Sequence, residues 1–192
     1  MTKRQPKGSP IGGQFAQDRK PDGGDLVRAM HTFGNSLIPA HRHENGGGWV
    51  ADTATVEPGA YVGPWAEVSG NAMVRGGARI SGRSVVEKDA VVTDNALILN
   101  SVVTDHAYVD GESRVLEGSV VKGSGRVTGF ATISRWSEVR DNARVSDFAQ
   151  VYNRATVAGQ VEVIHYAVVR GPDAVFDGYQ IVGDTDIIET IR

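Results

Sequence analysis

The chain has 192 residues, 40% of them hydrophobic, which is enough for one domain with a buried core. It contains no cysteine, which excludes disulfides, thiolate chemistry and cysteine-bound zinc. With a net charge of −3, no 18-residue apolar run and no signal-peptide pattern, we expect a cytoplasmic protein without a membrane partner, and the charge does not favour nucleic acid.

Residues 1–25 are rich in glycine, proline and charged residues, a composition typical of a disordered tail. The stretch from Pro10 to Ala16 nevertheless holds two large apolar residues, Ile11 and Phe15. These side chains offer a short docking segment for the groove of a protein partner. A solvated tail with no partner is the simpler alternative.

Residues 26–48 are predicted to form an N-terminal cap. The first coil of a solenoid exposes its core and its strand edges, and both need cover. Two helical turns are expected over residues 26–33. The apolar residues expected to cover the core are Leu26, Val27, Met30, Phe33, Leu37 and Ile38.

Residues 49–192 contain a six-residue repeat. Valine or isoleucine recurs every six positions from Val50 to Ile98, steps by five to Val103, and then recurs every six positions to Ile187. A small residue, mostly alanine or serine, stands two positions before most of these anchors. Glycine, asparagine, aspartate and proline fill the intervals, so each hexad is interpreted as one short strand and one tight corner.

Hexapeptide periods are typical of parallel β-helices. Nine anchors before the five-residue step and fifteen after it give twenty-four, which is about eight triangular coils of three strands. We therefore predict an all-β, single-stranded parallel β-helix with aliphatic anchors inside and small residues near the corners. The short step near Asn100 is interpreted as a corner trimmed by one residue.

The repeat resembles the left-handed β-helix of the hexapeptide-repeat superfamily. The Gly-Gly-Gly-Trp-Val entry at 46–50, with hexads such as Gly-Asn-Ala-Met-Val at 70–74 and Asp-Asn-Ala-Arg-Val at 141–145, is most similar to the YdcK-like β-solenoid family. The likeness covers about residues 46–170. It implies a left-handed winding and, by analogy with the superfamily, a trimer.

Outward columns follow from the eighteen-residue coil. Phe130, Phe148 and Tyr166 are eighteen residues apart and should stack as an exposed aromatic column. Such a column either protects a turn or contacts a partner, a sugar or a base. Two tryptophan–arginine pairs, Trp65–Arg83 and Trp136–Arg154, have the same spacing and are expected to form cation–π contacts.

Outward strand positions become apolar near the five-residue step, and a contiguous apolar surface usually means burial against another molecule. We expect self-association, with a trimer favoured, through this outer face. The residues that align on it are Val85, Val102 and Val120 on one face, Met73, Val91 and Tyr108 on the next, and Leu97, Leu99 and Leu116 nearby.

The superfamily also includes acyl-CoA-dependent acyltransferases, which carry a catalytic histidine. In this chain His106 is the candidate base, with Asp89 one coil earlier to orient it; a simple surface ion pair is the alternative interpretation. His165 is a second candidate base, and no metal site is expected among the five histidines.

Two hypotheses about function follow. The first is a non-enzymatic scaffold or binding protein that needs no cofactor. The second is an acetyltransferase that uses acetyl-CoA in a site between subunits, with His106 and Asp89 as catalytic residues. The absence of loops inserted between the hexads favours the scaffold.

Overall fold

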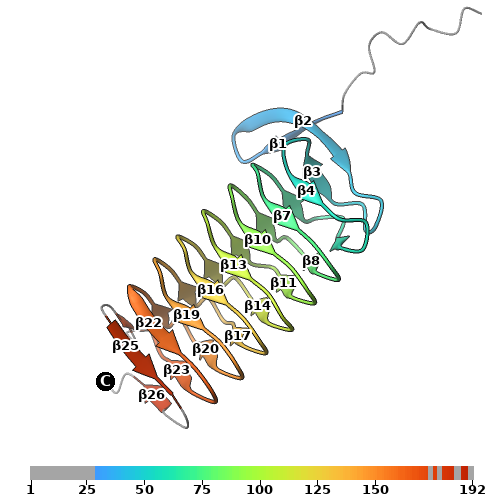
Figure 1. Cartoon of the computed structure of the whole chain (residues 1–192). Coiled ribbons are helices and arrows are strands. Elements are labelled where there is room, and N and C mark those ends of the chain that lie inside the picture. Colours follow the sequence, from blue (N-terminus) through green and yellow to red (C-terminus); the bar gives the residue numbers. More distant parts are fainter. Residues whose placement is uncertain (1–28, 173–174, 177–178, 184–186, 190–192) are drawn as a thin grey trace, which may run out of the picture.

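The computed structural model describes residues 29–172, 175–176, 179–183 and 187–189. The predictions for the tail at residues 1–25, including Ile11 and Phe15, lie outside the described residues, as do those for Leu26 and Val27. From Trp49 onward the chain winds as a parallel β-solenoid with three sheets, as predicted (Figure 1). Each sheet stacks eight solenoid strands, one per coil.

Sheet 1 also contains an N-terminal hairpin of β1 (Met30–Phe33) and β2 (Ser36–Arg42). Its solenoid strands are β3 (Trp49–Ala51), β6 (Glu67–Val68), β9 (Val85–Val86), β12 (Val102–Val103), β15 (Val120–Val121), β18 (Glu138–Val139), β21 (Thr156–Val157) and β24 (Val175–Phe176). Sheet 2 comprises β4 (Thr55–Val56), β7 (Met73–Val74), β10 (Val91–Val92), β13 (Tyr108–Val109), β16 (Arg126–Val127), β19 (Arg144–Val145), β22 (Gln160–Val163) and β25 (Tyr179–Val182). Sheet 3 comprises β5 (Tyr61–Val62), β8 (Arg79–Ser81), β11 (Leu97–Leu99), β14 (Arg114–Leu116), β17 (Thr132–Ile133), β20 (Gln150–Tyr152), β23 (Val168–Arg170) and β26 (Ile187–Glu189).

The core consists of the predicted anchors and small residues. Every anchor from Val62 to Val169 is completely buried, and the small residues two positions earlier are buried with them. Val56 is the exception, because its strand β4 forms the edge of sheet 2 and its side chain is only partly covered. The prediction of an inward aliphatic column on each of three walls is confirmed over these coils.

The last coil departs from the predicted register by one residue. Val157 pairs with Phe176, Val163 with Val182 and Val169 with Ile188. The prediction had placed Val175, Ile181 and Ile187 at these positions, and it is wrong by one residue. Tyr152 still pairs with Arg170, eighteen residues on, so the extra residue enters between Arg170 and Val175, in the corner that begins with Gly171-Pro172.

The five-residue step near Asn100 is a trimmed corner, as predicted. Asn100 adopts a left-handed conformation with φ 50°, which asparagine tolerates better than most residues. Its carbonyl accepts a hydrogen bond from the N–H of Gly118 in the next coil, at 2.7 Å. Its side-chain Oδ1 accepts one from the N–H of Arg83 in the previous coil, at 3.0 Å. The amide side chain thus satisfies a backbone donor in the shortened corner.

The predicted cap is present, but it is a β-hairpin and the expected helical turns are wrong. Strands β1 and β2 pair antiparallel with each other, and β2 pairs antiparallel with β3. The hairpin thereby covers the edge of sheet 1. Phe33 is buried in a small cluster with Ala40 and Ala51, whereas Met30 and Leu37, which were expected to cover the core, are exposed.

An aromatic and charged cluster holds this hairpin to the first coil. The ring of His31 stacks on Trp49 with centroids 4.4 Å apart, and His31 Nε2 lies 2.9 Å from Oε1 of Glu67. The guanidinium of Arg42 lies 4.1 Å from the Trp49 ring centroid and donates a hydrogen bond to the carbonyl of Gly47. Trp49 in the entry sequence therefore joins β1 and β2 to the solenoid.

The glycine run before Trp49 lets the chain cross above sheet 3. The N–H of Gly48 donates to the carbonyl of Val62, and the N–H of Val62 donates to the carbonyl of Asn45, so this segment covers the edge strand β5. A Cβ on Gly46 would lie 2.3 Å from the Val62 carbonyl oxygen, and a Cβ on Gly48 would lie 2.4 Å from Val62 Cγ1. Only glycine fits so close to the strand.

Replacing Asn100 with alanine should destabilise the protein by about 1–2 kcal/mol, because the Arg83 N–H loses its acceptor and alanine is less favourable in the left-handed region. Urea unfolding followed by circular dichroism measures this change. Asn100→Asp, which keeps Oδ1 and tolerates the same backbone, is the control and should lose less than half as much. Equal destabilisation by both variants would contradict the proposed role of the side-chain acceptor.

Candidate binding surfaces

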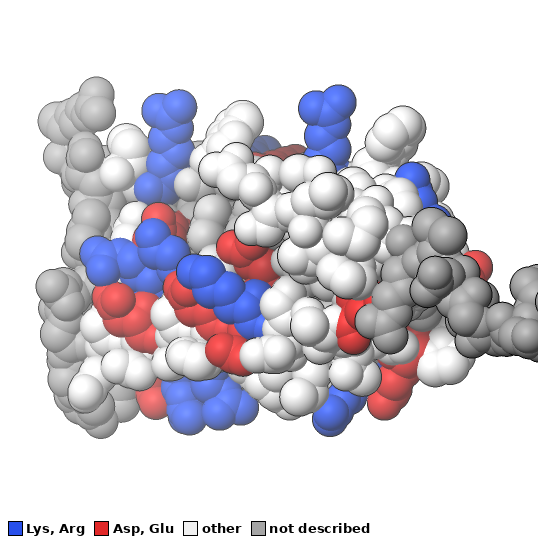
Figure 2. Space-filling view, turned by 90° about the horizontal axis from the view of Figure 1, so that it is seen from above, with Lys and Arg blue, Asp and Glu red and all other residues white. Residues whose placement is uncertain are grey.

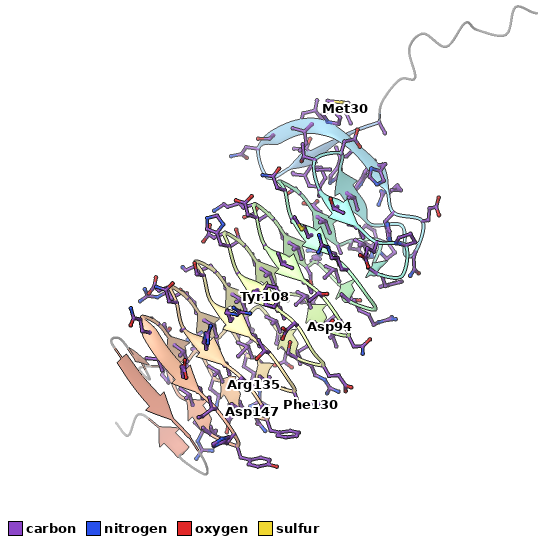
Figure 3. The ribbon with its side chains drawn as sticks, viewed as in Figure 1. Met30, Asp94, Tyr108, Phe130, Arg135 and Asp147 are labelled. Atoms are coloured by element: carbon purple, nitrogen blue, oxygen red, sulfur yellow. The ribbon has the colours of Figure 1, made fainter. Side chains whose placement is uncertain are left out.

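The predicted aromatic column is present at the corner between sheets 2 and 3. Phe130, Phe148 and Tyr166 stack on successive coils with centroids 5.0 and 5.1 Å apart and planes within 6° of parallel. The rings are 46–64% exposed, and Phe130, labelled in Figure 3, projects outward from its corner. Each ring follows a residue of positive φ that turns the chain: Gly129, Asp147 and His165.

The stacking decides which part of this aromatic column a partner can contact. Parallel rings 5 Å apart leave no space for another ring between them, because stacked aromatic centroids themselves need at least about 4.5 Å. The column therefore presents ring edges along its length, and only its two end faces are free of another ring within the column. A sugar or base that stacks between successive rings is excluded, and a flat apolar strip remains for contact.

The outward apolar residues align in register on two sheets. Val85, Val102 and Val120 are paired strand to strand on sheet 1. Met73, Val91 and Tyr108 are paired in the same way on sheet 2. All six side chains are half-buried. We call these six residues, together with Leu97, Leu99 and Leu116 of sheet 3, the apolar belt.

Charged residues bound the belt on sheet 1, and at one corner the belt continues from sheet 3 to sheet 1 past an uncharged residue. On sheet 1 it is bounded by Glu67 before Val85 and by Glu138 after Val120. Leu99 on sheet 3 and Val102 on sheet 1 flank the trimmed corner, where Asn100 is uncharged. Figure 2 shows one face of the molecule, on which charges of both signs gather toward the C-terminal half and uncharged side chains lie next to them.

The structure brings His106 and Asp89 together at the corner between sheets 1 and 2. Nδ1 of His106 lies 3.6 Å from Oδ2 of Asp89, and Asp89 also accepts a hydrogen bond from Asn71 at 3.0 Å. The two side chains are 72% and 49% exposed, so water reaches both. His165 lies elsewhere, at the corner of the aromatic column, beside Asp147, Phe148 and Tyr166.

A neighbouring ion pair at the same corner was not predicted. Lys88 Nζ lies 2.6 Å from Oδ1 of Asp105, whose Oδ2 accepts a hydrogen bond from the N–H of Gly123. The hydrogen bond from Lys88, and then the one from Gly123, hold the pKa of Asp105 below its ordinary value. Asp105 in turn raises the pKa of Lys88. The seventeen-residue spacing across the trimmed corner was the available sequence signal.

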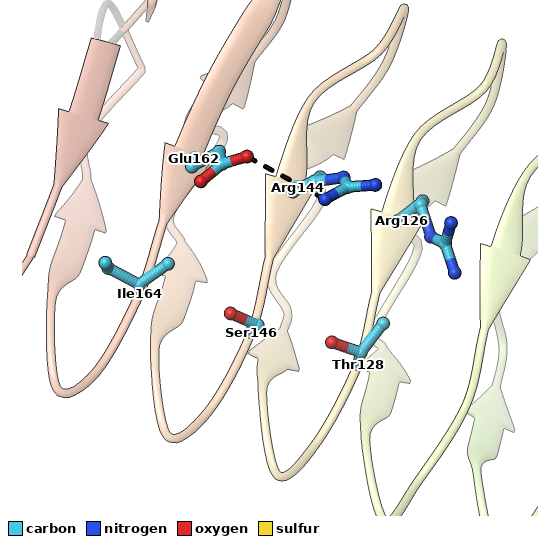
Figure 4. Close-up of a pocket in the computed structure, with 6 residues that line it drawn as sticks. All are labelled: Arg126, Thr128, Arg144, Ser146, Glu162 and Ile164. Atoms are coloured by element: carbon cyan, nitrogen blue, oxygen red, sulfur yellow. Dashed lines mark ion pairs between the residues drawn. The ribbon is translucent and has the colours of Figure 1, made fainter.

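A shallow hollow of about 220 Å³ lies on the outer face of sheet 2 (Figure 4). Arg126, Arg144 and Glu162 are successive outward residues of β16, β19 and β22, and Arg144 Nη1 lies 3.8 Å from Glu162 Oε1. Thr128 and Ser146 contribute hydroxyl groups to the lining. The guanidinium of Arg126 lies 4.7 Å from the Tyr108 ring centroid. Sequence analysis missed this arrangement, although the three charged residues are eighteen apart.

The two expected tryptophan–arginine contacts are not among the cation–π pairs of the described residues. The arginines that stack one coil after an aromatic ring do so over tyrosines on the flat faces, as in Arg79 over Tyr61 at 4.6 Å. Trp65 and Trp136 lie instead on corners and are largely exposed. The eighteen-residue spacing places each arginine one coil after its tryptophan, but neither pair is among the cation–π contacts of the described residues.

The described residues contain no group of three or more histidine, aspartate or glutamate side chains that could hold a metal ion. His43 is buried and Nε2 lies 3.0 Å from the carbonyl oxygen of Ala60, while His41 is exposed and pairs with Asp52. Over the same part of the chain, no helix is long and apolar enough to cross a membrane.

Comparisons of the chain with models of known families, with curated proteins and with solved structures find no significant match. The class of the molecule is therefore defined by its architecture, a β-solenoid with three parallel sheets. The hexapeptide-repeat and YdcK-like resemblance, and the left-handed winding that it implies, stay predictions.

Replacing Asp105 with asparagine should lower the melting temperature slightly at neutral pH, because the charged pair with Lys88 is lost; exposed pairs contribute little. The pKa of Asp105 is lowered by folding, so its contribution is complete above the ordinary carboxyl pKa and disappears as pH falls through the lowered value. The difference between variant and wild type should therefore shrink in acid. Thermal melts from neutral to acidic pH measure it, and a pH-independent difference would contradict the assignment.

Proposed function

We propose that the protein is a non-enzymatic β-solenoid scaffold that self-associates through its apolar belt. The observation that carries this proposal is the in-register alignment of outward apolar side chains on three successive coils. Outward positions of a solenoid face water in a monomer, so a confined run of valine, leucine, methionine and tyrosine is better accommodated when a second surface covers it.

The geometry of the trimmed corner supports the same proposal. Between sheets 1 and 2, charged corner residues such as Lys88 and Asp105 separate the apolar faces. In the trimmed corner only two residues, the uncharged Asn100 and Ser101, lie between Leu99 and Val102, and Leu116 and Val120 follow on the next coil. Apolar side chains therefore lie on both sides of one corner, which suits packing of subunits around a common axis. A trimer is the favoured assembly.

The aromatic column gives the assembled scaffold a contact surface on a different corner. Its ring edges form an apolar strip that starts on the coil of Val120, the last belt residue in the chain, and continues over the next two coils. Because the two surfaces use different residues, covering the belt leaves Phe130, Phe148 and Tyr166 available. We propose that this strip contacts a protein partner.

Light scattering tests the assembly. The wild-type protein should have three times the 20.5 kDa mass of one chain at micromolar concentration. Val102→Glu, in the centre of the belt, should shift the protein to monomer, because burying an unpaired carboxylate is unfavourable. Thr156→Glu places the same charge at an outward position of sheet 1 outside the belt and should leave the trimer intact. A monomeric wild type would reject the proposal.

The acyltransferase alternative depends on the 3.6 Å approach of Asp89 to His106. In that case a carboxylate orients an imidazole that removes a proton from the acyl acceptor, and a neighbouring subunit completes the pocket. Calorimetry with acetyl-CoA, together with His106→Ala, separates the two functions. Tight binding and turnover that is lost in the variant would favour the enzyme, and no binding at millimolar acetyl-CoA would favour the scaffold.

A further inference from the structure

The corner between sheets 3 and 1 has an unusual backbone in three successive coils. Two consecutive residues have positive φ at Glu117-Gly118, at Arg135-Trp136 and at Asn153-Arg154. Glycine and asparagine adopt this conformation readily, whereas bulky side chains rarely do. Gly118 shows that the turn itself suits glycine at the position where the next coil has Trp136, with φ 61°. The geometry of the turn therefore does not explain why a tryptophan occupies this position. Residues with a strained backbone of this kind cluster at functional sites.

The indole of Trp136 has one covered face and one open side. On the N-terminal side it lies close against Gly118, where a Cβ would come within 2.4 Å of Trp136 Cδ1. On the other side is a hollow of about 260 Å³, lined by Trp136 and Arg135, by Asn153 and Arg154 of the next coil, and by Pro172 of the coil after that. The side chain remains 67% exposed. Trp136 thus forms one wall of an open hollow, not part of a packed surface.

The polar groups of this hollow favour an anion. Arg135 lies 3.8 Å from the carboxylate of Glu117 and 3.4 Å from Oδ1 of Asn153. Within the described part of the chain, Arg154 makes no ion pair. Arg135 and Arg154 carry two positive charges and only Arg135 has a carboxylate partner, Glu117, so a net positive charge remains beside the indole. Guanidinium groups bind phosphate and carboxylate oxygens through paired N–H donors.

We propose that this hollow binds a planar aromatic molecule that carries an anionic group, with the ring stacked on Trp136 and the anion held by Arg154 and Arg135. A nucleoside monophosphate belongs to this class. The volume lies slightly below the range of pockets for drug-sized ligands, so it suits one ring system with one anion better than a dinucleotide. The site lies on the corner between sheets 3 and 1, further along the chain than the belt, and none of its lining residues belongs to the belt.

Titration of the full-length protein with adenosine 5′-monophosphate, followed by calorimetry, tests this site. Trp136→Gly should weaken binding about tenfold or more, the range expected for loss of one stacked base. Its melting temperature should be unchanged or higher, because glycine suits φ 61°. Arg154→Gln should also weaken binding, and Arg83→Gln, at the equivalent corner position near the start of the solenoid, should not.

Adenosine and inorganic phosphate test the two parts of the proposed ligand, the aromatic ring and the anionic group, one at a time. Each should bind more weakly than the monophosphate, because each offers only one of the two contacts. The proposal is overturned if millimolar monophosphate gives no binding, if Trp136→Gly binds as wild type does, or if adenosine binds as tightly as its monophosphate. The melting temperature of Trp136→Gly is measured alongside its binding, so a loss of binding in a variant that melts like the wild type is not attributed to unfolding.

Discussion

The structure depends on the limited width of its triangular interior. Each wall places one valine or isoleucine per coil inside, and these side chains are completely buried from Val62 to Val169. The alanines and serines two positions earlier lie beside the corners and are buried as well, and between Ala60 and Ala167 a larger residue takes this position only at Val161. Because protein interiors are close-packed, the two columns set the cross-section together. The outward residues are free to vary only because this interior is constant.

Backbone hydrogen bonding between coils imposes a second constraint, which acts at the corners. A residue of positive φ turns the chain there, and its neighbours bond to the adjacent coil: the N–H of His106, for example, donates to the carbonyl of Gly123. Carboxylates at such corners also accept backbone N–H groups, as Asp147 does from His165. Corner side chains are therefore part of the ladder, and their columns stay aligned over many coils.

The fold was predictable because a period of six is visible without any knowledge of distant contacts. From one aliphatic anchor per hexad we predicted the three sheets, the buried column of small residues and the aromatic stack of Phe130, Phe148 and Tyr166. The hairpin at Met30–Arg42 was missed, since its strand pairing with β3 depends on tertiary contacts such as His31 on Trp49. The one-residue shift of the last coil was also missed. Val175 still fits the six-residue period, but the extra residue before it makes Phe176, and not Val175, the partner of Val157.

The candidate sites were less predictable than the fold. Residue spacing correctly placed His106 beside Asp89, but it also suggested contacts of Trp65 with Arg83 and of Trp136 with Arg154. An eighteen-residue spacing puts two residues on the same corner of successive coils, but whether their side chains touch also depends on the rotamers that they adopt, which the spacing does not give. The positive φ of Trp136 and the pairing of Lys88 with Asp105 became visible only in three dimensions.

Coil length is not fixed along the solenoid. Between Val86 and Val103 the chain closes a coil in seventeen residues, most coils take eighteen, and the coil from Val157 to Phe176 takes nineteen. The three sheets nevertheless continue through all of these coils. Insertions and deletions of single residues are thus absorbed where the chain turns, so homologous chains of different length can keep every wall in alignment, and alignments of such chains should place their gaps at corners.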